Sequence, residues 1–426
     1  MFLWLLPHSG TFPSRIFPLL LLAILFVAIA NELQDRRFTL PISIAKTSND
    51  GLSPSQPIAA DLSNENYLIY FSFDGFSNQI IGFQRAAQLA WSVNRTLVIP
   101  PVLPHNQKKS TPPPFDAFPG RKGPSGSCRD QPQKYSLCVE GVLRDARAVL
   151  DGKPFPSLTN LVDVDLLRKQ VPALRVIDFP EFMSLTNRHE ALKREFWAMN
   201  ETLGNTGLDL DGRCTIQETR SYPDLLLYFN AQFGNKRIAM IGSAFNLQNK
   251  FAYHNISARL LNFPLTPRMQ VLTQDIRSKL PSSYVGVHMR FKDDATFDCA
   301  TNETDIATAF HNVVTKIQNT QVTSVLVGES HPQAAPCLRA ALPSSFTILT
   351  VSDMVKKHPK IHQQMNDIPL QLNTVHLLLD QLLLALADWV VLDTAAFYAF
   401  SSTFQTLIEE RHRHRTSIVQ GNRSSW

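Results

Sequence analysis

From residue 67 onward, short apolar runs alternate with longer stretches whose apolar residues recur at helical spacing. Short runs that are bounded by turn-forming residues predict buried strands, and the helically spaced stretches between them predict amphipathic helices. The predicted strands are residues 67–73, 96–99, 174–177, 237–241, 284–289, 322–327, 346–351 and 389–392. The predicted helices are residues 78–93, 163–170, 269–280, 305–318, 334–341, 372–387 and a last one that ends near residue 411.

Strands that alternate with helices form parallel sheets with both faces covered. The chain has 426 residues, too many for one such sheet, so we predict an α/β fold with two Rossmann-like halves facing a central cleft. Ligands in such folds bind beyond the carboxyl ends of the strands. We place an N-terminal half at residues 63–265, a C-terminal half at 266–412 and a tail at 413–426. No internal sequence repeat is evident.

The first 30 residues are predicted to be a targeting segment. Residues 16–30 are apolar apart from Pro18, but this run is shorter than the roughly 20 residues that span a bilayer. Ala28 and Ala30 offer a small-residue cleavage signature. A cleaved signal peptide and a single type II membrane anchor both fit, and both place the body of the chain in the secretory pathway, in the endoplasmic reticulum or Golgi lumen. Residues 31–62 are predicted to be a stem.

Composition supports a globular lumenal protein. Hydrophobic residues make up 44% of the chain and charged residues 18%. The net charge of +5 is spread along the sequence, which argues against nucleic acid as a partner. Five cysteines allow up to two disulfides, and without a C-x-x-C pair a zinc site is not expected. Glycosylation sequons begin at Asn94, Asn200, Asn255, Asn302 and Asn422. The basic run at 411–415 is interpreted as a solvated helix end rather than an anion or membrane contact.

The first candidate constellation follows the first strand, where Gly75 and Phe76 precede Ser77, Asn78 and Gln79. We expect Gly75 to permit a tight turn. The free N–H groups and the positive dipole of a starting helix would suit a phosphate or a sugar hydroxyl. The alternative is simple helix capping by Ser77 or Asn78.

The second constellation lies at the end of the strand 284–289. His288 and Arg290 would lie on one face of this strand and Val287 and Met289 on the other. Two basic groups at a buried strand end need a counter-charge, which a nucleotide diphosphate would supply to the forked guanidinium. Asp294 in the following loop would orient His288 or hold a ribose or base. The alternative is an internal ion pair between Arg290 and a nearby aspartate.

The third constellation begins at Asp393 and Thr394, where the last strand passes into a helix. Hydroxyls and Phe397 at this junction would suit a second phosphate contact or base stacking, whereas capping and helix–sheet packing would explain the same residues. Two D-x-D pairs, at 163–165 and 209–211, match the spacing of metal-dependent glycosyltransferases. We interpret the first as a helix cap and the second as a turn.

Taken together, these segments resemble the GDP-fucose protein O-fucosyltransferases, most closely the type that modifies EGF-like repeats. The resemblance rests on Asn78-Gln79 with the run 94–101, on 285–290 with Asp294 and Cys299, and on 382–388 with 409–411. It implies a GT-B fold and an inverting transfer of fucose from GDP-fucose to a Ser or Thr hydroxyl, with no metal or other cofactor.

The resemblance also implies roles for individual residues. Arg290 would hold the β-phosphate of the leaving GDP, and Asn78 would lie near the glycosidic oxygen and the acceptor hydroxyl. The remaining predicted donor-binding residues are His288, Asp294, Gly75, Phe76, Thr394, Phe397, Ser401 and Ser402.

The chain departs from the family pattern at the last junction. The family has Ser-Ser-Phe or Ser-Thr-Phe there, and this chain has Ala395-Ala396-Phe397, with Ser401-Ser402-Thr403-Phe404 as a second register. The acceptor would be a secretory-pathway protein, such as one with a small disulfide-rich repeat. Two alternatives stay open, namely a fucosyltransferase acting on another acceptor and a non-catalytic relative that binds GDP-sugars.

Overall fold

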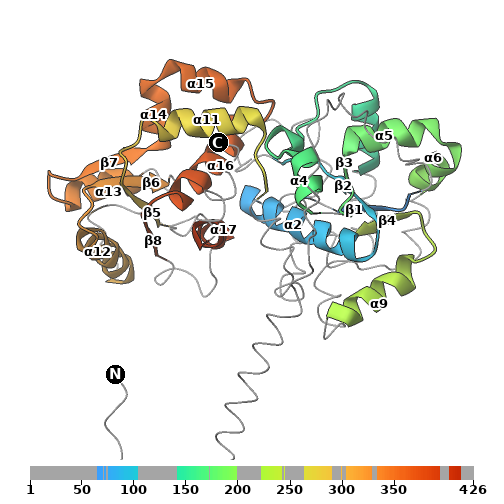
Figure 1. Ribbon diagram of the computed structural model, residues 1–426, viewed down its shortest axis with the longest axis horizontal. Coiled ribbons are helices and arrows are strands. Elements are labelled where there is room, and N and C mark those ends of the chain that lie inside the picture. Colours follow the sequence, from blue (N-terminus) through green and yellow to red (C-terminus); the bar gives the residue numbers. More distant parts are fainter. Residues whose placement is uncertain are drawn as a thin grey trace, which may run out of the picture. The chain divides into compact units, whose positions relative to one another are not determined.

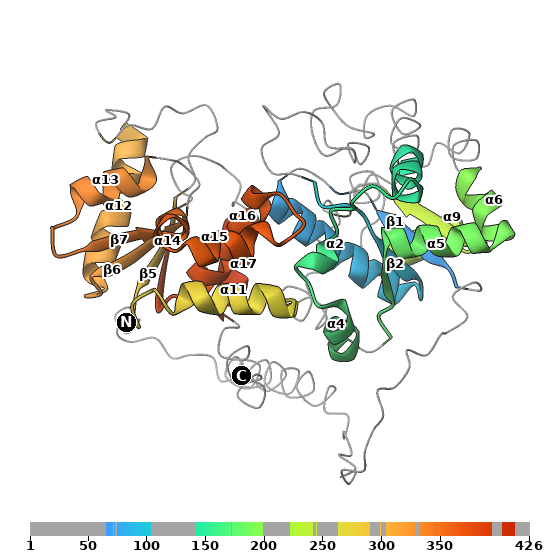
Figure 2. The same cartoon turned by 90° about the horizontal axis from the view of Figure 1, so that it is seen from above.

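A computed structural model of the protein describes residues 65–70, 72, 75–103, 142–171, 173–198, 222–241, 244, 263–289, 299, 304–328, 333–393 and 403–413. The chain divides into two units, residues 1–60 and 61–426, and all the described residues belong to the second. Figures 1 and 2 show the described helices and strands in two views.

In the described part of the first half, the strands form a four-stranded parallel sheet with the order β3-β2-β1-β4. They are β1 (Tyr67–Tyr70), β2 (Thr96–Ile99), β3 (Val176–Asp178) and β4 (Ile238–Ile241). In the register, Tyr67 of β1 pairs with Thr96 of β2 and with Ile238 of β4. All four residues of β1, β2 and β4 are buried, as expected for strands covered on both faces.

The second half repeats this topology, because its parallel sheet has the order β7-β6-β5-β8. Its strands are β5 (Val285–Met289), β6 (Ser324–Gly328), β7 (Thr347–Thr350) and β8 (Trp389–Asp393). Counted within each half, both sheets run 3-2-1-4. The predicted α/β class with two Rossmann-like halves is confirmed. The chain contains a structural repeat that its sequence did not reveal, because parallel strands need buried apolar residues but not particular ones.

Helices cover both faces of each sheet. The labelled helices of the first half are α2 (Phe76–Ser92), η3 (Leu158–Asn160), α4 (Val164–Gln170), α5 (Phe179–Arg188), α6 (Glu190–Trp197) and α9 (Tyr222–Phe233), and residues 142–150 are helical as well. Those of the second are α11 (Pro267–Arg277), α12 (Thr304–Asn319), α13 (Ala334–Ala341), α14 (Val351–Lys357), α15 (Pro359–Asn366), α16 (Leu372–Ala385) and α17 (Thr403–Arg413). The sequence pattern did not predict α5, α6, α9, α14 and α15.

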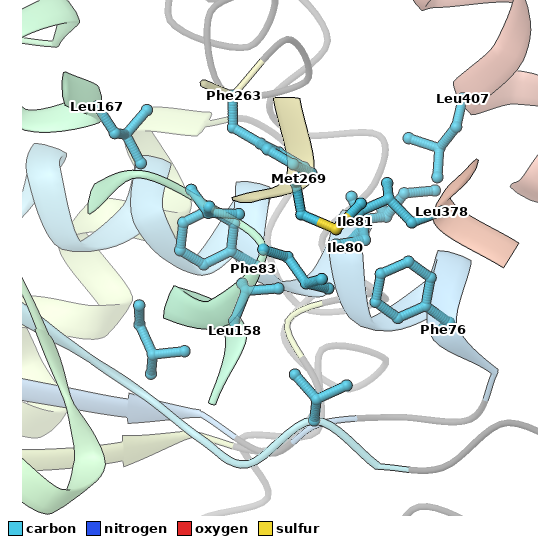
Figure 3. Packing of buried hydrophobic residues seen from close by; sticks show 14 of the residues in the cluster. Phe76, Ile80, Ile81, Phe83, Leu158, Leu167, Phe263, Met269, Leu378 and Leu407 are labelled. Atoms are coloured by element: carbon cyan, nitrogen blue, oxygen red, sulfur yellow. The ribbon is translucent and has the colours of Figure 1, made fainter. Parts of the chain in front are cut away.

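The apolar side chains of the described residues gather in three clusters between these layers. One lies between the first sheet and α5 and α6, and another between the second sheet and α12 and α13. The largest is continuous from one half to the other, because α2 of the first half and α11, α16 and α17 of the second contribute to it (Figure 3). The predicted bounds of the halves, 63–265 and 266–412, stay predictions.

The predicted targeting segment, residues 1–30, and the stem, residues 31–62, lie outside the described residues. Within the described part of the chain, no helix is both long and apolar enough to cross a membrane.

Candidate functional site

The carboxyl end of β5 carries His288. The side chains of Val285, Val287 and Met289 enter the cluster shared with α12 and α13. His288 lies on the opposite face, as the strand alternation predicted, and only 3% of it is exposed. It pairs in register with Gly328 of β6, where a methyl group in place of the glycine hydrogen would lie 3.6 Å from its Nδ1. A residue larger than glycine at position 328 would therefore reduce the space available to the imidazole of His288.

Phe404, at the start of α17, stacks on His288. The two ring centroids are 4.4 Å apart and the ring planes are inclined by 29°. This contact places Phe404, the last residue of the second register of the last junction, beside the predicted donor-binding histidine. The sequence alone did not select Phe404, because Phe397 fits the same junction pattern in the first register.

The first turn of α2 carries Gly75, Phe76 and Asn78. Gly75 is the N-cap, and its carbonyl accepts hydrogen bonds from the N–H groups of Asn78 (2.9 Å) and Gln79 (3.2 Å). The φ of Gly75 is −61°, a value open to any residue, so the backbone conformation of this turn does not depend on glycine. The N-cap residue of α2 is Gly75, and Ser77 and Asn78 lie inside the helix, so the alternative that one of them is the N-cap is wrong.

Gln79 has a structural role next to this turn. Its Nε2 donates to the carbonyl of Leu103 (3.0 Å), and its Oε1 accepts from the N–H of the same residue (2.9 Å). The Ser72 hydroxyl donates to the carbonyl of Pro101 (2.9 Å). These bonds connect the segment after β2 to Ser72 and Gln79, which lie on either side of the predicted site residues Phe76 and Asn78.

Both predicted constellations lie at equivalent places in the two sheets. In a sheet with the order 3-2-1-4, the direction of strand succession reverses at the first strand, and ligands bind beyond the carboxyl ends at such a switch point. Here β1 lies between β2 and β4, and β5 lies between β6 and β8. The chain passes from β1 to Gly75 and Asn78, and β5 ends one residue after His288. The fold therefore places each constellation where α/β proteins bind ligands.

Six predicted site residues lie outside the described residues and stay predictions. They are Arg290, Asp294, Thr394, Phe397, Ser401 and Ser402. The two alternatives for Arg290, a phosphate contact and an internal ion pair, are therefore both open, as are those for the third constellation.

Two other motif residues have structural roles. Asp163, the first residue of a D-x-D pair, caps α4 by accepting a hydrogen bond from the Leu166 N–H (2.9 Å), as predicted; the pair at 209–211 lies outside the described residues. Arg95 is 4% exposed and donates to the carbonyls of Tyr67, Phe233, Lys236 and Arg237. Burial lowers its pKa to about 10.

The burial of Arg411 differs from what the sequence predicted. We expected the basic run at 411–415 to be a solvated helix end, but Arg411 is only 3% exposed, and burial lowers the pKa of its guanidinium to about 10. Its NH1 donates to Oε1 of Gln381 (3.3 Å) on α16. Sequence reasoning missed both residues as neighbours of the site. The signal that could have found Gln381 is the presence of polar residues inside the leucine-rich run 372–387.

A disulfide joins Cys299 to Cys337 of α13 across a sequence separation of 38 residues. In the sequence, Cys299 follows the segment that contains Arg290 and Asp294. The disulfide therefore anchors the chain, a few residues after these predicted donor-binding residues, to the helical layer of the second sheet.

No protein-family model matches the sequence. The chain is 30% identical over 179 residues to O-fucosyltransferase 30 of Arabidopsis thaliana, a match that covers 40% of this chain and 28% of the relative. The chain thus resembles an O-fucosyltransferase. The resemblance that the motifs indicated is confirmed over this part of the chain, which spans well under a third of the relative's length.

Solved structures that align with this chain include POFUT1 in complex with GDP, with 13% identity, 82% of this chain and 94% of that chain covered, and a TM-score of 0.45. The α-1,6-fucosyltransferase NodZ, co-crystallised with GDP, has 14% identity over 81% of this chain and 92% of that chain, with a TM-score of 0.41.

Proposed function

We propose that this protein is a glycosyltransferase that moves fucose from GDP-fucose to a Ser or Thr hydroxyl of a secretory-pathway protein. The observation that carries the proposal is the position of His288 and of the Gly75–Asn78 turn at the switch points of two sheets with the same strand order. Similarity to O-fucosyltransferase 30 supports fucose as the transferred sugar.

The donor would bind at the carboxyl end of β5. Arg290, two residues after His288, would grip the β-phosphate with its forked guanidinium and stabilise the charge that develops as GDP leaves. His288 and Asp294 would hold the nucleotide, and Phe404 keeps the imidazole in place by stacking. Ser401 and Ser402 precede Phe404, so the second register would bring hydroxyl groups toward the phosphates, with Thr394 and Phe397 completing the junction.

The transfer step needs one bond to form and one to break. The acceptor oxygen would attack the anomeric carbon of fucose from the face opposite the phosphate, and the bond from that carbon to the β-phosphate oxygen would break with inversion. The electron pair leaves with GDP, and the acceptor proton passes to the departing phosphate or to water. Asn78, on the first turn of α2, would hydrogen-bond the glycosidic oxygen or the acceptor hydroxyl. In this scheme Arg290 supplies the positive charge, so no metal ion is required.

The proposed function implies that the protein works in the secretory pathway. The Cys299–Cys337 disulfide is a bond of oxidising compartments, and the predicted targeting segment at residues 1–30 would direct the chain into the endoplasmic reticulum or Golgi lumen.

The experiment that tests the proposal measures GDP-fucose turnover and GDP affinity in the presence of a metal chelator. Wild-type protein should bind GDP and release it from GDP-fucose, and Arg290→Ala should lose at least about a hundredfold in rate. Arg188→Ala is the matched control, because Arg188 is an exposed arginine of α5 and should leave both values unchanged. Binding of GDP without turnover would identify a non-catalytic relative, and the absence of any binding would refute the proposal.

A further inference from the structure

A chain of hydrogen bonds joins the first turn of α2 to two helices of the second half. Nε2 of Gln381, on α16, donates to the Ser77 hydroxyl (2.8 Å), and Oε1 of Gln381 accepts from NH1 of Arg411, on α17 (3.3 Å). Gln381 is fully buried, and Arg411 is almost so. Both ends of the Gln381 amide thus have partners, which removes most of the penalty for burying it.

Arg411 also contacts the segment through which the chain passes into α11. Its guanidinium lies over the ring of Phe263, 5.1 Å from the ring centroid. The segment that begins at Phe263 is tied to the first half, because Leu265 forms an antiparallel bridge with Val162 and the Pro264 carbonyl accepts from the Asp163 N–H (2.8 Å). Arg411 therefore lies at a junction of both halves and the segment between them.

Apolar side chains surround this junction. Phe76 and Ile80 of α2 belong to the same cluster as Leu378 of α16 and Leu407 of α17, and Figure 3 shows these side chains gathered around the start of α2. Hydrogen bonds in such a dry environment hold their geometry well, because a broken bond leaves a buried polar group without a partner.

The first turn of α2 is thus held by a residue of the second half. Ser77, the second residue of the helix, accepts a hydrogen bond from Gln381 through its side chain, and the next residue is Asn78.

We propose that Gln381 and Arg411 are positioning residues that fix the first turn of α2, and with it Asn78, to the half of the protein that carries His288. This inference rests on the proposed function insofar as Asn78 acts on the transferred sugar. It implies that the start of α2 moves with the second half, although the rest of the helix packs on the first sheet. Asn78 and the donor site then keep one relative geometry through the reaction cycle.

The test uses two substitutions of Gln381 in the full chain. Gln381→Leu keeps the volume and removes both hydrogen bonds. Gln381→Glu keeps them, because a carboxylate accepts from Arg411 and also from the Ser77 hydroxyl, which can reverse its role. Ile317→Val is the control for general destabilisation, because Ile317 is buried in the separate cluster under α12.

The first readout is amide hydrogen exchange at residues 78–80. We expect exchange about fivefold faster in Gln381→Leu than in wild type, because the turn loses its external bond. Gln381→Glu should restore the wild-type rate, and Ile317→Val should not change it. Ser77→Ala, which cuts the other end of the link, should reproduce the effect of Gln381→Leu and serves as the second variant if the latter does not fold.

The second readout is transfer kinetics. We expect kcat to fall at least about tenfold in Gln381→Leu, with the Kd for GDP within about twofold of wild type, because a misplaced Asn78 affects the reacting atoms but not the nucleotide. Unchanged exchange in both Gln381→Leu and Ser77→Ala would overturn the link, and faster exchange with an unchanged kcat would overturn the positioning role. If wild type binds no GDP, the proposed function fails, and the exchange rates alone then decide the link.

Discussion

Substitution of Gly286 by alanine should destabilise the second half of the protein. Gly286 is the second residue of β5, on the face that packs against α16. A methyl group added there would lie 3.0 Å from the carbonyl oxygen of Leu384, 3.0 Å from Cβ of Ala387 and 3.2 Å from Cδ2 of Leu384. The first two of these atoms are fixed by the backbone, so the strand or the helix must move to make room.

The expected cost follows from two opposing effects. Forcing a methyl group into a filled core costs about 1–3 kcal/mol. Replacing glycine by alanine restricts the unfolded chain and returns about 0.4–1 kcal/mol. Taking the middle of each range, the net loss in the free energy of unfolding should be about 1.3 kcal/mol. Because His288 lies two residues further along β5, the same displacement should weaken GDP binding.

Gly328→Ala is the matched comparison. Its added methyl group would lie 2.7 Å from Cδ1 of Leu384, a shorter contact than at Gly286. That atom, however, is the end of a side chain that can rotate, so we expect a smaller cost. Urea unfolding followed by tryptophan fluorescence would measure both variants. A Gly286→Ala protein as stable as wild type, or a larger cost at Gly328, would refute the reasoning that the rigid contacts of α16 fix β5.

Three further predictions concern the stability of the protein. Cys337→Ala should lower the free energy of unfolding by about 4 kcal/mol relative to the oxidised wild type, from the loop entropy of a 38-residue separation. A reductant should then destabilise the variant less than it destabilises wild type in chemical unfolding, and equal stabilities of variant and oxidised wild type would contradict the prediction. Arg95→Met should cost about 2–4 kcal/mol in the same assay, because four backbone carbonyls lose their shared donor; a change below about 0.5 kcal/mol would be inconsistent with it. Burial raises the pKa of Asp178 to about 6, so the folded state binds a proton at this carboxyl more tightly than the unfolded state does. The resulting stabilisation is complete below about pH 4, and up to about 3 kcal/mol of the free energy of unfolding is lost as the pH rises from about 4 to 6. Asp178→Asn should remove that slope from unfolding curves measured across this pH range, and an unchanged slope would speak against the assignment.

The strands and the first helix were predictable from the sequence because their residues are uniformly apolar or regularly amphipathic. The runs that form β1, β2, β5 and β6 are dominated by Val, Ile, Leu and Tyr, and they are buried on both faces. Helices α5 and α6 were missed although Asp178 and Pro180 form a start signal for α5. Both helices are short, and their apolar residues face the first sheet only once the sheet exists, so no single window of sequence showed them.

The candidate site was predictable only where its residues follow strands. Alternation along β5 was enough to place His288 opposite Val287, because the side-chain period of a strand is fixed. The contacts of His288 with Phe404 and of Ser77 with Gln381 join residues that are far apart in the sequence, and no local pattern encodes such pairs. Arg411 was misread because a basic run at a chain end is usually solvated. Its burial depends on Phe263 and Gln381, which approach it only in the folded protein.

The central claim is that the two equivalent sheet ends form a site for a guanosine diphosphate sugar. The most direct measurement is calorimetric titration of the full chain with GDP-fucose in a chelating buffer, repeated with UDP-glucose. We predict saturable binding of GDP-fucose, with one site per chain and no detectable binding of UDP-glucose. Absence of heat with GDP-fucose, or equal affinity for both nucleotide sugars, would contradict the claim.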